Sequence, residues 1–325
     1  MTRPPAISIA HIEAAAKRIA PIAWRTPIVP SPWLSDLTGA DVWLKLEIVQ
    51  ATGSFKIRGA ANALALLEES RPHAKVVVTA SAGNHGQAVA AAAARLGYQA
   101  RIHLPASAPA VKRDAIARLG AVIVEAASYE AAEHRAHEDA RDTGAIFVSP
   151  YDDADVIAGA GTVALEMIAD RPDLDTFVVP LGGGGLLSGV AIVARARVKA
   201  PLVVGAEAEA SPVFTAALAA GRPVTVDVKP TLADGLAGNM EPESQTFALV
   251  RDLVDRVETV GERAIETAMR NLISRDRLIA EGAAATAVGA LLQGGLDVRG
   301  RHVGVVLSGR NTDFLTGQWP MATGH

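Results

Sequence analysis

Short apolar stretches and longer helical stretches alternate along most of this chain, and this alternation limits its fold more than any other feature. The stretches expected to form strands are 75–79, 100–104, 121–124, 145–148, 177–180, 202–204 and 303–307. Those expected to form helices are 87–96, 110–119, 129–142, 158–169, a run from 186, 262–275 and 283–292. Apolar strands that alternate with helices are typical of parallel sheets covered on both faces. We therefore predict an α/β fold with parallel twisted sheets flanked by helices, and an irregular segment over the proline-containing residues 211–243.

Composition excludes several classes of function. The chain has 31 Lys plus Arg against 35 Asp plus Glu, a formal net charge of -4, which gives no electrostatic basis for binding nucleic acid or an anionic membrane. It has no cysteine, so disulfides, thiolate metal sites and a cysteine nucleophile are excluded. Residues 1–20 contain no uninterrupted apolar run, so we expect no signal peptide and a cytoplasmic protein.

Four consecutive glycines, Gly182 to Gly185, follow the predicted strand 177–180 and precede a helix that opens at Leu186. Glycines let a ligand approach the backbone, and the free N–H groups at a helix start favour a phosphate. A dinucleotide-binding loop needs a small residue where Leu187 stands, but Glu207 lies where a ribose-binding carboxylate would be. From this motif alone, a nicotinamide-dependent oxidoreductase therefore stays open.

Three further loops carry polar residues at the ends of predicted elements. Lys56 lies among small and apolar neighbours in residues 53–60 (GSFKIRGA), where burial would favour a reactive amine, although an ordinary surface lysine fits the spacing better. Residues 81–86 (SAGNHG) follow strand 75–79 and suit either a carboxylate site or a turn capped by Asn84. Ser308 follows strand 303–307, as a ring-binding hydroxyl or as part of a plain turn.

Taken in order, these loops resemble the fold-type II pyridoxal-phosphate (PLP) enzymes, and within them the branch of threonine/serine dehydratases and serine racemases. The resemblance runs from Pro27 to Asp313. It rests on residues 53–60, 81–87, 156–159 (VIAG) with 161–162 (GT), 181–185, 231–235 (TLADG) and 308–309. It implies two lobes: a large cofactor-binding domain of residues 1–70 and 151–325, and a small domain of residues 71–150.

The resemblance also implies roles for individual residues. Lys56 holds the cofactor and moves the proton at the substrate Cα, and Gly182, Gly183, Gly184 and Gly185, with the amide of Leu186, cradle its phosphate. Phe55 and Gly235 flank the ring, Asn84 bonds the ring hydroxyl, and Ser308 meets the pyridine nitrogen. Ser81, Asn84 and His85 frame the substrate carboxylate.

These residue types favour elimination. A neutral Ser308 supplies no charge to the ring nitrogen, which weakens the ring as an electron sink and suits loss of a β-substituent. In the racemases of this branch a hydroxyl precedes the loop glycine, whereas here Ala82 precedes Gly83 and cannot exchange a proton. We therefore predict dehydration and deamination of a small L-hydroxy amino acid, such as threonine or serine, to a 2-keto acid and ammonia.

The sequence leaves alternatives within and outside this family. Arg310 replaces a glycine of the family's Ser-Gly-Gly-Asn motif, which keeps a 3-hydroxyaspartate or hydroxyectoine-pathway dehydratase open beside a racemase. Relatives hold a divalent cation (Mg or Ca) near the position of Glu207, but the later acidic ligand is missing around Val213, so we assign no metal ligand. A PLP-binding sensor is disfavoured because every catalytic position is filled. We expect a homo-oligomer, a dimer or a tetramer.

Overall fold

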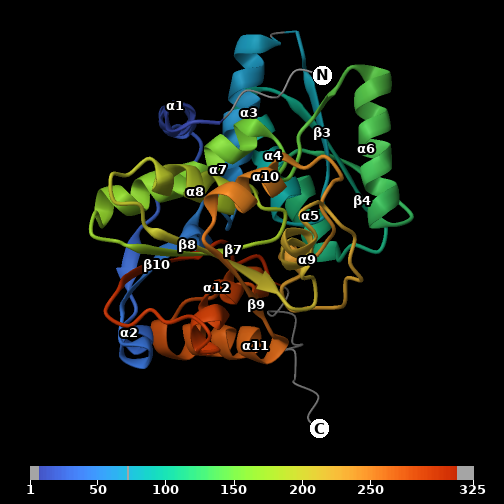
Figure 1. Cartoon of the computed structure of the whole chain (residues 1–325). Coiled ribbons are helices and arrows are strands. Elements are labelled where there is room, and N and C mark those ends of the chain that lie inside the picture. The colour runs from blue at the N-terminus through green and yellow to red at the C-terminus, as the bar shows by residue number, and fades with distance from the viewer. Residues whose placement is uncertain (1–6, 72, 313–325) are drawn as a thin grey trace.

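The computed structural model describes residues 7–71 and 73–312 and contains two β-sheets (Figure 1). The larger sheet has the order β1-β2-β10-β7-β8-β9, and all its neighbouring strands run parallel except β1 and β2. Its strands are β1 (Ile28–Pro30), β2 (Asp41–Leu46), β7 (Thr176–Pro180), β8 (Leu202–Ala208), β9 (Arg256–Val260) and β10 (His302–Leu307). Asp313, the last residue of the family resemblance, lies outside the described residues.

The smaller sheet is parallel throughout and has the order β5-β4-β3-β6. Its strands are β3 (Val76–Ala80), β4 (Gln99–Pro105), β5 (Val122–Ala126) and β6 (Ile146–Phe147). Each strand coincides within about two residues with a predicted apolar stretch. The predicted α/β class with parallel sheets is thus confirmed.

Helices cover both faces of the large sheet (Figure 1). Apolar residues of α1, α7, α8 and α10 pack on one face, and those of α2, α11 and α12 on the other. These helices are α1 (Ile9–Ile19), α2 (Pro32–Thr38), α7 (Ala154–Asp170), α8 (Gly185–Arg195), α10 (Gln245–Leu253), α11 (Glu262–Asn271) and α12 (Gly282–Leu292). All five residues of β7 are buried, as expected for a central strand covered on both sides.

The small sheet is covered by α3 (Lys56–Ser70), α4 (Asn84–Leu96) and α5 (Ala110–Arg118) through one apolar cluster, and by α6 (Tyr129–Thr143) through another. The remaining elements are α9 (Val213–Ala220), the 3-10 turns η1 (Glu47–Val49) and η2 (Asp234–Leu236), and the π-helical turn η3 (Leu272–Asp276). Within the described residues, no helix is long and apolar enough to span a bilayer.

Two glycines bring α7 close to the helices beside it. A Cβ on Gly159 would lie 2.3 Å from the carbonyl oxygen of Arg58 in α3, and one on Gly189 of α8 would lie 2.6 Å from the amide nitrogen of Gly161. Backbones approach this closely only where side chains are absent. Helix α3, which begins at Lys56, is therefore held tightly against α7.

The segment 211–243 was predicted to be irregular, and this is wrong for residues 213–220, which form α9. The helix is short, and the carboxylate of Glu207 accepts hydrogen bonds from the amides of Phe214 and Thr215 in its first turn. This cap comes from β8 rather than from the residue before the helix. The local pattern that predicts helix starts therefore does not contain it.

Candidate active site

Lys56 is the first residue of α3 and lies at the meeting point of several loops. Its Nζ donates a hydrogen bond to the carbonyl oxygen of Pro150 at 2.7 Å and lies 5.2 Å from the centre of the Phe55 ring. The amide of Phe55 bonds the carbonyl oxygen of Ser308 at 2.9 Å. The backbone at the end of β10 thereby fixes the start of α3.

Burial changes the chemistry of this amine. Desolvation lowers the pKa of Lys56 from 10.5 to about 8, and the charge of Glu281 opposes part of that shift. An amine with this pKa has a sizeable neutral fraction near neutrality, and only the neutral form attacks a carbonyl. The structure thus places Lys56 in a desolvated site rather than on an open surface.

The tetraglycine loop forms a cradle at the start of α8. Gly184 has φ of +87°, a conformation that favours glycine, and a Cβ on Gly183 would come within 2.3 Å of the Tyr151 ring. Thr246 Oγ1 donates to the carbonyl oxygen of Gly183 at 2.8 Å, which holds the loop from a third segment. Since Tyr151 directly follows Pro150, the cradle and the Lys56 amine meet on the same short stretch of chain.

The loop after β3 brings polar groups to the same region. The Ser81 hydroxyl accepts a hydrogen bond from the Gly83 amide at 3.2 Å, and α4 begins at Asn84, with Gly83 rather than Asn84 at its N-cap. His85 Nε2 lies 3.0 Å from the carbonyl oxygen of Val148 and is the nitrogen that carries the proton in that bond. This polar loop follows a strand of the small sheet, whereas the glycine cradle follows a strand of the large one.

His85 is neutral in this environment. Burial, with the nearby charge of Lys56, lowers its pKa from 6.5 to about 3, against a smaller opposite effect of the Val148 carbonyl. Its Nδ1 is buried and has no hydrogen-bond partner in the described part of the chain. Buried polar atoms are rarely left unpaired, so Nδ1, which is an acceptor in this tautomer, fits a ligand that brings a hydrogen-bond donor, and the glycine cradle fits a phosphate.

The loops after β10 and around η2 complete the cluster. Ser308 is buried, and the next residue, Gly309, forms an isolated antiparallel bridge with Ser54. A Cβ on Gly235 would lie 3.2 Å from the Cβ of Ala283 and 4.0 Å from the carboxylate of Glu281. The loop that contains Lys56 and the loop that contains Ser308 are therefore in direct contact.

A family model described as "Pyridoxal-phosphate dependent enzyme" matches residues 19–309, most of the chain. The chain belongs to this family. The predicted family and its cofactor, pyridoxal phosphate, are confirmed, and the prediction now has a geometric counterpart in the cluster around Lys56.

Named relatives agree with this assignment. The chain is 42% identical to an L-threonine ammonia-lyase of Thermotoga maritima, over 94% of this chain and 76% of the relative. It is 38% identical to a catabolic L-threonine dehydratase of Staphylococcus aureus, over 95% of this chain and 90% of that one. The solved structure of maize serine racemase superposes with a TM-score of 0.90 at 36% identity, covering 96% of this chain and 95% of that one.

The Glu207 carboxylate is bonded within the protein and is not available to bind the ribose of a nicotinamide cofactor. It is 1% exposed, and its oxygens accept hydrogen bonds from the amide of Phe214 at 2.6 Å and from the amide and hydroxyl of Thr215 at 3.0 and 2.8 Å. These donors occupy the carboxylate that the nicotinamide alternative required. The carboxylate therefore points toward α9. The groups that face it there are N–H and O–H donors, whereas a cation site needs oxygen acceptors.

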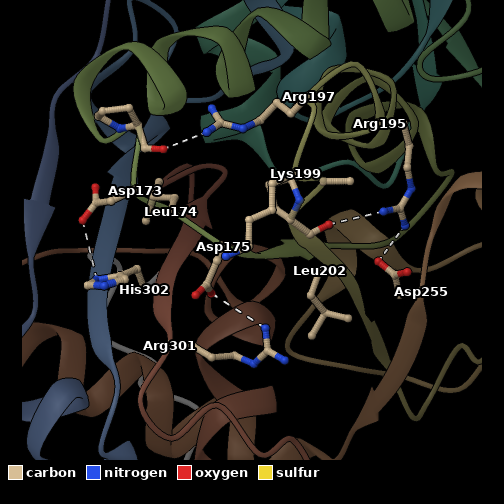
Figure 2. Close-up of a pocket in the computed structure, with 13 residues that line it drawn as sticks. Asp173, Leu174, Asp175, Arg195, Arg197, Lys199, Leu202, Asp255, Arg301 and His302 are labelled. Atoms are coloured by element: carbon tan, nitrogen blue, oxygen red, sulfur yellow. Dashed lines mark hydrogen bonds and ion pairs between the residues drawn. The ribbon is translucent and has the colours of Figure 1, made fainter.

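One open cavity of about 550 Å³ lies elsewhere, at the amino ends of β7, β8 and β10 (Figure 2). Its Arg195 is ion-paired with Asp255 at 2.6 Å, and its Arg301 lies 3.8 Å from Asp175. Ligands of parallel α/β sheets bind at the carboxyl ends of strands, where Lys56 and the glycine cradle are found. The cavity in Figure 2 is therefore not the candidate active site.

Sequence reasoning missed Glu281, Tyr151 and Thr246. Glu281 is 6% exposed, and its Oε1 accepts a hydrogen bond from Asn84 Nδ2 at 2.7 Å. Its sequence signal was a lone acid inside residues 278–285 (LIAEGAAA), just before a predicted helix. An acidic residue is rarely buried unless it is paired or belongs to a functional site, so an acid within an apolar run is a candidate site residue.

Proposed function

We propose that this chain is a PLP-dependent ammonia-lyase that removes water and ammonia from a small L-hydroxy amino acid, such as threonine or serine, to give a 2-keto acid. The observation that carries the proposal is the desolvated amine of Lys56, whose pKa is lowered to about 8. This amine bonds the carbonyl of Pro150, and the next residue, Tyr151, packs against Gly183 of the glycine cradle. Relatives named as threonine ammonia-lyases and dehydratases support this choice of reaction.

In this proposal, Lys56 binds the cofactor and, once displaced by substrate, takes the proton from Cα. When bound, the cofactor supplies an electron-withdrawing ring that makes that proton acidic. The backbone of Gly182–Gly185 and the amide of Leu186 bind the phosphate at the start of α8, where free N–H groups favour an anion. Phe55 and Gly235 flank the ring.

Two further groups orient the ring and the substrate. Ser308 meets the ring nitrogen with a neutral hydroxyl, so the protein does not stabilise a positive charge there, which favours elimination over transamination. Ser81, Asn84 and His85 surround the substrate carboxylate, and Asn84 also donates to the ring hydroxyl. Ser308 and His85 are buried, which excludes water from their side of the site.

Ala82 decides between dehydratase and racemase in this proposal. Its methyl group packs at the edge of the apolar cluster of α3, α4 and α5 and can neither donate nor accept a proton. We expect Ala82→Ser to raise the ratio of racemisation to elimination about tenfold or more, because it adds a hydroxyl on the second face of the substrate. A chiral amino-acid assay alongside a keto-acid assay measures this ratio. An unchanged ratio in a folded, cofactor-loaded variant would show that the missing hydroxyl is not what separates the two reactions.

The direct test combines colour with product. Purified protein should show the visible absorption band of bound PLP, and Lys56→Ala should lose that band while Lys75→Ala, an exposed lysine, keeps it. Keto acid should then form from serine, threonine or one of the 3-hydroxyaspartate diastereomers. The 3-hydroxyaspartate diastereomers address Arg310, which is exposed in the loop after β10. A coloured protein that forms no keto acid from any of them would favour a sensor, and a colourless one would end the proposal.

We also propose that residues 1–70 and 151–325 act as the large cofactor-binding domain and residues 71–150 as the small one. The support is that β3 to β6 all lie between residues 76 and 147, while the other strands lie outside that range. We further propose a cytoplasmic homo-oligomer, in keeping with a chain that has no cysteine. Light scattering on the purified holoenzyme gives its mass, and a monomer would contradict the oligomer.

A further inference from the structure

Glu281 is a buried carboxylic acid at the centre of the cluster, and nothing in the proposed reaction yet uses it. It is the N-cap residue of α12, and its amide bonds the carbonyl oxygen of Gly309 at 3.0 Å. The carboxylate lies against the loop after β10, since a Cβ on Gly309 would come within 2.5 Å of Oε1. Glycine at this position therefore makes room for the acid.

The carboxylate of Glu281 reaches the site through Asn84. Asn84 Nδ2 donates to Glu281 Oε1 at 2.7 Å, and Asn84 Oδ1 accepts from Asn311 Nδ2 at 2.7 Å. Asn311 Nδ2 also donates to the carbonyl oxygen of Thr52 at 2.8 Å. Both hydrogens of Asn311 are thus used, and its amide faces one way only.

This network decides which way the Asn84 amide points. The Asn311 side chain offers hydrogens, so Asn84 must turn its oxygen to Asn311 and its nitrogen to Glu281. An ionised carboxylate accepts hydrogen bonds and donates none, so it enforces the same orientation from the other side. One N–H of Asn84 is then left over, and it is available to the ring hydroxyl of the cofactor.

We propose that Glu281 is the positioning residue that holds the Asn84 amide toward the cofactor ring, and that a proton on Glu281 releases it. This inference rests on the proposed function, because it assigns the remaining N–H of Asn84 to PLP. A protonated Glu281 accepts a hydrogen bond more weakly than a carboxylate does and offers an O–H of its own, so the Asn84 amide is then anchored on the Asn311 side only. The hydrogen bond from Asn84 to the ring then loses its fixed geometry.

The charges around Glu281 allow this proton to exchange near neutral pH. Burial raises its pKa from 4.5 to about 7, Asp234 of η2 adds to the rise, and the Asn84 amide, Lys112 of α5 and the Asn311 backbone oppose it. Lys56 of α3 is the other charge that faces the acid, because Glu281 raises the pKa of its amine. Lys112 and Asp234 are themselves paired at 3.1 Å.

The test is a pH titration of the visible spectrum of the PLP-loaded holoenzyme between pH 5.5 and 9. We expect a spectral transition near pH 7 in the wild type and none in Glu281→Gln, which keeps the acceptor for Asn84 but cannot ionise. Glu207→Gln is the matched control, because Glu207 is also a buried carboxylate with a raised pKa but bonds α9 instead of Asn84. The Glu207→Gln variant should keep the spectral transition. Asn84→Ala should lose the transition as well, because Glu281 acts through that amide.

Cofactor affinity gives a second readout that does not depend on activity. Glu281→Gln should bind PLP within about twofold of the wild type, and Glu281→Leu, which leaves Asn84 without its acceptor, about tenfold more weakly. A wild-type transition that persists with the same midpoint in Glu281→Gln overturns the positioning role and leaves the lyase intact. A wild type without any PLP band ends both proposals, and circular dichroism confirms that each variant is folded.

Discussion

Lys56 and Arg58 lie two residues apart in the first turn of α3, yet their surroundings are opposite. Side chains at this spacing point to different sides of a helix. The Lys56 amine donates to one backbone carbonyl. The Arg58 guanidinium is buried among carboxylate oxygens and bonds Glu47 at 2.7 and 2.8 Å and Glu166 at 2.7 and 2.9 Å.

This difference appears in the pKa of each group. Burial lowers the pKa of Lys56 to about 8, because the charge of Glu281 compensates for only part of the lost hydration. Burial also acts against the charge on Arg58, but Glu47 and Glu166 outweigh it and raise the pKa. The same helix turn therefore contains a reactive amine and a permanently charged guanidinium. The difference between their pKa shifts comes from the two carboxylates that contact Arg58 and not Lys56.

Removing the amine should produce the largest effect, and on activity alone. We expect Lys56→Met to lower keto-acid formation at least about 10³-fold, because no other side chain can replace an amine that forms a covalent bond. The free energy of unfolding of the cofactor-free protein should change by less than about 1 kcal/mol, since the variant loses the hydrogen bond to the Pro150 carbonyl but also removes a desolvated amine. Activity assays and urea unfolding of the two cofactor-free proteins measure both quantities. A Lys56→Met variant that keeps a tenth of the activity would contradict the role of Lys56.

Removing the Arg58 guanidinium should give the second-largest effect, and this effect is on the free energy of unfolding. We expect Arg58→Met to lower the free energy of unfolding by about 3–5 kcal/mol, because it leaves the buried Glu47 without its counter-ion and Glu166 with Lys45 alone. Arg251→Met, which removes an exposed partner of Asp252, is the control and should change the unfolding midpoint little. If both variants unfold at the same denaturant concentration, the buried network does not stabilise the start of α3.

Acid should produce the smallest of these effects and sharpen the comparison. Burial acts to raise the pKa of Glu166, but Arg58 and Lys45 outweigh it and lower the pKa below the ordinary 4.5. A carboxyl group with a lowered pKa in the folded state stabilises the protein above its unfolded pKa, and this stabilisation is lost as pH falls through the folded value. The difference in melting temperature between wild type and Arg58→Met should therefore narrow below about pH 4.5. A constant difference down to pH 3 would show that Glu166 is not the group that Arg58 holds ionised.

The parallel sheets were predictable because their strands and helices alternate in the sequence and carry their own periodicity. The strands β2 and β9 and the helix α10 were not predicted, since β2 mixes apolar and polar residues and β9 (Arg256–Val260) is short and charged. Helix α7 begins at Ala154, earlier than the predicted residue 158, because the side chain of Asp153 caps it. A cap of this kind is local, and closer attention to Asp153 would have found the boundary.

The candidate site divides in the same way. Lys56, the four glycines and Asn84 stand in short motifs whose order along the chain identifies the family, and the structure then supplies their surroundings. Tyr151 and Thr246 were missed because they contact the glycine loop from residues that precede and follow it by about 30 and 60 positions. Neither residue belongs to a local pattern.

The sequence by itself determined the fold class, the family and the lysine, because periodicity and ordered motifs are properties of neighbouring residues. Only the tertiary structure decided what each charge does. Glu207 caps a helix, Arg58 closes an ion network, and Glu281 meets an asparagine that lies 197 positions away. Ionisation depends on burial and on partners brought together by folding, and neither of these is written in the distance between residues along a chain.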